Sequence, residues 1–185
     1  MVYNKEARSL EEAFFLKRDT ELMEEMKRQE KLQTRKRALK EVSGITDEDV
    51  LNELVEHEIQ PETLAAFSLV PIIEVAWADG TLQPKEREAI LQAIEETGIT
   101  KESIAFRLME EWLEQRPAPR LLQVWKEYAG ALVRELDAEA SDGLRRTVID
   151  SARSVAEAAG GFLGFGRISG PEEKMLQELE SAFQK

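Results

Sequence analysis

The sequence predicts an all-helical protein, a bundle of about seven helices made of two related helical hairpins in residues 45–185 and preceded by a long N-terminal helix in residues 1–41. Apolar residues recur at three- and four-residue spacing through most of the chain, which is typical of amphipathic helices. No stretch alternates with period two for long enough to form a strand. A chain of 185 residues suffices for one ordinary domain plus an extension.

The N-terminal arm is predicted because residues 5–41 are nearly all good helix formers and contain no Gly or Pro. Its apolar positions lie mainly between Leu10 and Met26, and the stretch from 27 to 40 is basic. We expect the front half to dock, either on its own domain or on a protein partner or second copy, and the back half to be solvated. Phe14 and Phe15 would anchor a partner.

The helices of the domain are placed by caps and breakers. Ser43-Gly44 ends the arm, and Thr46 caps a helix that runs to about Ile59. Pro61 opens the next helix. Residues 64–78 are almost wholly apolar and predict the buried central helix, with a kink at Pro71.

Further helices are predicted over 84–97, 101–115, 121–136, 144–159 and 170–183, with a corner at Ser141-Asp142-Gly143. A glycine-rich connector occupies residues 160–166. Its alternative role is a flap that uses Phe162 and Phe165 to grip an apolar partner.

The two halves of the domain share a short repeat. VAWADG at residues 75–80 matches VAEAAG at 155–160, and LQPKE at 82–86 matches ISGPE at 168–172. Each half therefore reads as helix, glycine stop, short turn and second helix. The repeat keeps a glutamate, Glu86 and Glu172, at the start of each second helix, where it can cap the helix. It replaces Asp79 by Ala159.

Asp79 and Glu86 are the candidate metal ligands. Their spacing, with Gly80 and Leu82 between them, matches the second half of an EF-hand loop, but Val75 and Trp77 stand where the first half needs oxygen ligands. A standard EF-hand is therefore excluded. A weak site for Ca, Mg, Mn or Zn remains open, with Glu74 or Glu88 as further ligands, beside the alternative that Glu86 only caps a helix and Asp79 only stabilises a turn.

Composition excludes several functions. Residues 1–41 hold 11 Lys/Arg against 9 Asp/Glu, and the remaining residues hold 14 Lys/Arg against 28 Asp/Glu. The domain is therefore expected to bind nucleic acid poorly. There is no cysteine, and the single histidine, His57, has no partner motif and is expected at the surface. No apolar run is long enough for a membrane span, and we expect a cytoplasmic protein.

The residues at 75–80, 82–87 and 168–173 resemble the TerB-like (tellurite-resistance protein B) family, which includes the N-terminal domain of membrane-anchored DnaJ-type co-chaperones. The resemblance covers roughly residues 60–183. It implies a seven-helix fold of two related halves, acidic residues suspected of metal binding near the Ala-Asp-Gly turn, and a role in stress response or as an interaction module rather than in catalysis. The alternatives are a structural homo-oligomer that uses the arm and a metal-dependent carboxylate enzyme.

Overall fold

The computed structural model describes the backbone of residues 3–159 and 168–184 and the side chains of residues 15–158 and 168–184. The described residues form only α-helices and turns. The helices are α1 (Tyr3–Ser43), α2 (Glu48–Glu56), α3 (Leu64–Ser68), α4 (Val70–Ala76), α5 (Pro84–Glu96), α6 (Ile104–Glu114), α7 (Pro119–Glu135), α8 (Ala138–Ala159) and α9 (Gly170–Ser181). The all-helical bundle with a long N-terminal helix is confirmed.

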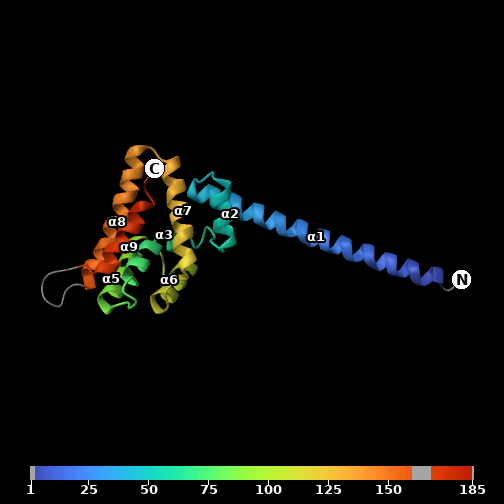
Figure 1. Ribbon diagram of the computed structural model, residues 1–185, viewed down its shortest axis with the longest axis horizontal. Helices are drawn as coiled ribbons and strands as arrows, with labels where there is room; N and C mark the ends of the chain where they lie inside the picture. The colour runs from blue at the N-terminus through green and yellow to red at the C-terminus, as the bar shows by residue number, and fades with distance from the viewer. Residues whose placement is uncertain (1–2, 160–167, 185) are drawn as a thin grey trace.

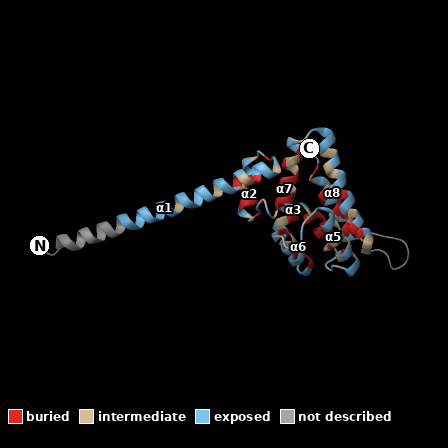
Figure 2. Cartoon of the chain, turned by 180° about the vertical axis from the view of Figure 1, so that it is seen from behind, coloured by how far each residue is buried: buried red, intermediate tan, exposed pale blue. Residues whose placement is uncertain are grey.

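Helix α1 projects away from the body formed by α2–α9 (Figure 1). Its C-terminal part contacts the body: Leu39 is buried, Leu32 is partly buried, and the buried Lys36 pairs with Glu48 of α2 at 3.2 Å. The prediction that the front half docks on its own domain is wrong for the described side chains, because Leu16 and Met26 are exposed. Figure 2 shows most of the described length of α1 in the colour of exposed residues. The back half docks instead, because Leu32 and Leu39 share one face and the lysine stem of Lys36 lies along it.

Helix α2 begins one residue later than predicted. Asp47, not Thr46, is the N-cap, and its Oδ1 accepts hydrogen bonds from the amides of Asp49 and Val50 at 3.1 and 3.2 Å. Its other oxygen accepts from Arg134 of α7 at 2.7 Å. A carboxylate is the better cap here because one oxygen closes the helix end while the other holds a neighbouring helix.

The predicted central helix is two helices, α3 and α4. The break falls at Leu69, and Pro71 occupies the first turn of α4, where its missing N–H removes no helical hydrogen bond. Pro71 therefore starts a new helix rather than kinking a continuous one. Every residue of α4 is buried, as a helix that is apolar on all sides requires.

The two predicted hairpins, α4–α5 and α8–α9, pack against each other. Helix α4 contacts α8 and α9, and α5 contacts α8. The corner predicted at Ser141-Asp142-Gly143 is wrong, because these residues lie inside α8. The turn is at Leu136, and Asp137 accepts the amide of Ala140 at 2.8 Å to start the helix. Helix α8 continues through Asp142, whose side chain pairs with Arg145 one turn later.

The core lies among these hairpins, α2, α6 and α7. Its largest fully buried side chains include Phe67, Ile73, Ile90, Met109 and Leu179. Phe67 meets Tyr128 edge to face with ring centres 5.5 Å apart, which ties α3 to α7. This core brings the first turns of α5 and α9 together, and both turns carry the repeated glutamates.

Candidate functional sites

The Ala-Asp-Gly turn is closed by its own side chains. Gly80 has φ of +93°, a left-handed conformation that favours glycine. Asp79 Oδ1 accepts hydrogen bonds from the Thr81 amide at 2.9 Å and the Thr81 hydroxyl at 3.1 Å. Before the turn, Trp77 Nε1 donates to the carbonyl of Trp112 at 2.9 Å, which fixes the turn to the end of α6. Asp79 thus has the turn-stabilising role that its position beside glycine favours.

Glu86 and Glu172 cap their own helices. Glu86 Oε2 accepts the Gln83 amide at 2.7 Å, and Glu172 accepts the Ser169 amide while Ser169 Oγ accepts the Glu172 amide at 3.3 Å. Both side chains are buried, with residue exposures of 2% for Glu86 and 4% for Glu172. The capping role predicted for them is therefore confirmed, and the repeat brings two carboxyl groups into the core.

The pKa of Glu86 is raised by its surroundings. Burial raises the pKa of Glu86, the amide of Gln83 opposes this, and the hydrogen bond and charge of Glu172 and the charge of Asp79 raise it further, to about 7. Both burial and nearby negative charge disfavour the ionised form of a carboxyl group, and both act on Glu86. We call Asp79, Glu86 and Glu172 the carboxyl cluster; within it, Glu86 can hold a proton near neutral pH.

The further ligands considered from the sequence do not join this cluster. Glu74 is 1% exposed, and its Oε2 is paired with Arg116 Nη2 at 2.8 Å, whereas Oε1 is buried with no hydrogen-bond partner. Burial raises the pKa of Glu74, and Arg116 opposes that rise. Glu88 is exposed. In the described part of the chain, no three acidic or histidine side chains are grouped so that they could hold a metal ion.

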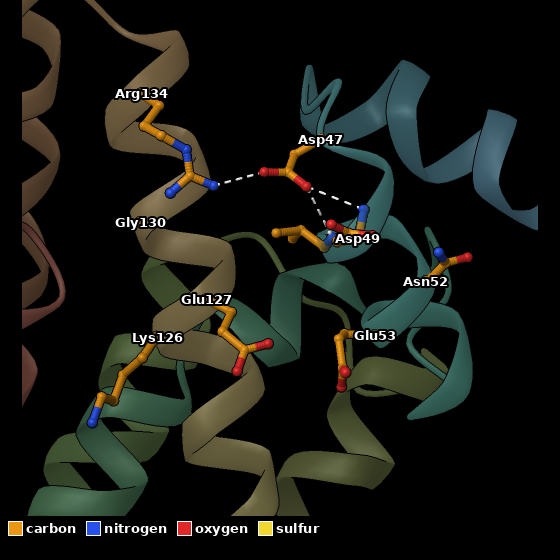
Figure 3. Close-up of a pocket in the computed structure, with 9 residues that line it drawn as sticks. Asp47, Asp49, Asn52, Glu53, Lys126, Glu127, Gly130 and Arg134 are labelled. Carbon is orange, nitrogen blue, oxygen red and sulfur yellow. Dashed lines mark hydrogen bonds and ion pairs between the residues drawn. The ribbon is translucent and has the colours of Figure 1, made fainter.

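A polar cleft between α2 and α7 was not predicted from the sequence. It has a volume of about 560 Å³, and Figure 3 shows Asp47 bridged to Arg134 at one end, with Glu53 and Glu127 farther along it. Asp49, Asn52, Lys126 and Gly130 also line it. These residues come from two helices that are about 75 positions apart, and no local pattern links them. The lining suits hydrated cations or basic side chains.

A second groove, of about 690 Å³, runs between the α2–α3 connection and α6–α7. Its apolar lining includes Ile104, Leu108 and Leu121. His57, placed at the surface by the sequence, is partly exposed at its edge, where Arg120 Nε donates to His57 Nε2 at 3.3 Å. The histidine therefore acts as a hydrogen-bond acceptor for a neighbouring arginine.

The structure describes the side chains of only some of the residues predicted to bind a partner. Phe15 is exposed on α1, whereas the side chain of Phe14 and residues Phe162 and Phe165 lie outside the described residues. The exposed large apolar side chains of the described chain are Phe15, Leu16, Leu22, Met23, Met26, Val42 and Ile104. All but Ile104 lie on α1. None of the described helices combines the length and the apolar character needed to cross a membrane.

Comparisons with known proteins found no relative of this chain. No protein-family model, no curated protein and no solved structure matches the chain. The resemblance to the TerB-like family stays a prediction that rests on the short motifs around the two turns.

Proposed function

We propose that this chain is a non-catalytic, TerB-like interaction module in which the body is a scaffold and α1 carries the surface for a protein partner. The observation that supports this most directly is the exposure of Phe15, Leu16, Leu22, Met23 and Met26, which we call the apolar patch of α1. These side chains are between 57% and 69% exposed, on a helix that stands clear of its own core (Figure 2). Exposed apolar side chains gathered on one side of a helix favour a helix-binding partner.

The charge distribution supports a protein rather than a nucleic acid as partner. The residues after 41 hold 28 Asp/Glu against 14 Lys/Arg, which repels phosphate backbones. The stress-related role that the TerB-like resemblance implies belongs to this proposal, as does the absence of catalysis.

Photo-crosslinking tests the proposed surface. p-Benzoylphenylalanine in place of Leu22 is expected to crosslink the full chain to a protein in the cells that produce it. The same residue in place of Glu24, which is exposed on the opposite side of α1, is the matched control and should give a much weaker adduct. Equal adducts, or none at position 22, contradict the proposal.

A divalent-cation site at Asp79 and Glu86 is the second candidate function. It is favoured by the carboxyl cluster, in which the charges of Asp79 and Glu172 raise the pKa of Glu86. A cation bound by Asp79 and Glu86 would replace the proton that Glu86 holds below its pKa of about 7. Because a cation competes with that proton, binding should be stronger at pH 8 than at pH 6.

Trp77 reports on this site because it lies two residues before Asp79. Millimolar Ca²⁺, Mg²⁺, Mn²⁺ or Zn²⁺ should change its fluorescence and raise the melting temperature, and Asp79→Asn should weaken both effects. If neither quantity responds to any of the four ions at pH 8, the ion site is refuted and the interaction module is unaffected.

A further inference from the structure

We propose that the partner of α1 is a second copy of this chain, and that the two α1 helices pair antiparallel about their midpoint. The inference rests on the proposed role of α1 as a binding surface and names the occupant of that surface. Four observations support it: the side of α1 on which the apolar patch lies, its position along the helix, the distribution of charge, and the area that the pairing would bury.

The apolar patch lies on the side of α1 that faces away from the body. At about 100° per residue, its five side chains fall within an arc of about 120°. Leu32 and Leu39, which contact the core, lie on the opposite side of the same helix. The body of the same chain therefore cannot cover the patch by a small movement. Most of the stability of helices in proteins comes from the packing of an apolar face, so a partner on this side would stabilise α1.

The patch is centred on the free length of α1. Leu16 and Met26 are equidistant from residue 21, and so are Tyr3, where α1 begins, and Leu39, its fully buried residue. An antiparallel pair centred on residue 21 thus places patch on patch and uses the whole projecting helix. The start of each α1 then lies next to the body of the other copy. There it meets the side of the other copy's α1 that the body does not cover.

Charge distinguishes the antiparallel pair from the parallel one. Residues 27–39 carry six Lys/Arg and one Glu, whereas residues 3–15, which lie opposite them in the antiparallel register, carry two Lys/Arg and three Glu. A parallel pair would align the basic stretches and bring two acidic bodies together. The antiparallel pair separates the bodies by about 50 Å along the helix axis, many times the Debye length of about 8 Å at physiological salt.

The same charges disfavour a membrane as the occupant. Residues 15–26 carry Asp19, Glu21, Glu24 and Glu25 against two bases, Lys17 and Arg18. Helices that lie on anionic lipid place bases beside their apolar face. Here the strongly basic stretch begins only after the apolar patch ends.

The pairing is expected to be reversible. A contact strip about 10 Å wide along about 50 Å of helix buries about 1,000 Å² over the two copies, which is at the lower end of specific interfaces. Asp19 lies within the apolar arc and interrupts it. We therefore expect dissociation in the micromolar range, corresponding to about 8 kcal/mol.

Sedimentation of the full chain tests the dimer. Between low and several hundred micromolar protein, the mass should rise from 21.0 kDa towards twice that value. Leu22→Gln/Met23→Gln should weaken dimerisation at least tenfold. Lys17→Gln/Glu24→Gln, exposed substitutions on the other side of α1 that leave the net charge unchanged, should not change it. Far-UV circular dichroism of each variant shows whether α1 stays helical.

The orientation is measured with spin labels, which is simple because the chain has no native cysteine. A label at Arg35→Cys, an exposed site away from the patch, should give a distance of about 40 Å or more in the antiparallel dimer and under about 25 Å in a parallel one.

Three results overturn the inference: a monomer at every concentration, a dimer unaffected by the patch variant, and a short label distance. Co-sedimentation of the monomer with phosphatidylserine–phosphatidylcholine vesicles would assign the patch to lipid and also overturn it. A monomer whose Leu22 crosslinks to a different protein overturns only this inference and leaves the proposed function standing. A monomer without any crosslink at position 22 refutes both.

Discussion

Replacing Glu86 by Gln should make the stability of this protein less sensitive to pH. Glu86 is 2% exposed, accepts the Gln83 amide and interacts with Glu172, and together burial and Glu172 raise its pKa from the ordinary 4.5 to about 7. Between these two values the folded state binds a proton at Glu86 more tightly than the unfolded state does. This stabilisation is complete below the unfolded pKa and is lost as the pH rises through the folded pKa.

The magnitude follows from the two pKa values. When the pH rises from 5.5 to 8, ionisation of Glu86 should lower the unfolding free energy by about 2 kcal/mol. The lower limit of this range stays above the isoelectric point of 4.8. Glu86→Gln has nearly the same shape, can still accept from the Gln83 amide and cannot ionise. Its advantage over the parent chain should therefore grow by about 2 kcal/mol over this pH range.

Urea unfolding followed by tryptophan fluorescence at several pH values measures this difference. Glu88→Gln, an exposed substitution on the same helix, is the control and should leave the pH dependence unchanged. The pKa of Glu74 is also raised, but Glu74 is present in both proteins and its effect cancels in the comparison. Parallel curves for the parent chain and Glu86→Gln would show that the Glu86 proton is not stabilised by folding, and would refute the reasoning.

Two further predictions concern stability. Arg116→Ala leaves the buried Glu74 carboxylate without its cation, and should lower the unfolding free energy by about 3 kcal/mol at pH 8. The loss should be smaller at pH 5.5, because burial raises the pKa of Glu74 and Arg116 no longer opposes that rise; an equal loss at both pH values, by the same urea assay, would contradict a charge effect. Gly80→Ala forces a side chain onto a residue with φ of +93° and should destabilise by about 1–2 kcal/mol. Gly143→Ala, within α8 and facing open space, should instead stabilise by about 0.5–1 kcal/mol; melting temperatures that shift in the same direction for both glycines would refute the conformational argument.

Local patterns were sufficient for most elements of the fold. Helix α5 begins at Pro84 as predicted, and it ends at Glu96, one residue before the predicted end. Such features depend on residues within one or two turns of each other, and these are visible in a sequence. The predictions failed where a local signal allowed two outcomes: Pro71 could kink one helix or start another, and the tertiary packing of α3 and α4 decided for the second.

The candidate sites show the same division. The repeat identified Glu86 and Glu172 as equivalent caps, but nothing in the sequence indicated that Glu172 would help to raise the pKa of Glu86 in the core. The cleft between α2 and α7 joins Asp47 to Arg134, and residues so far apart in the chain are brought together only by helix packing.

The order of residues alone determined that this chain is helical, where most of its helices start and stop, and that an acidic body follows a basic stretch. Those properties arise from backbone propensity, apolar periodicity and the sum of charges, each of which acts over a few residues or over the whole chain. Only the tertiary structure decided which half of α1 is buried, because amphipathic segments specify a face to be covered and not what covers it. It also decided the chemistry of Glu86, because the pKa of a carboxyl group depends on the groups and the solvent around it in space.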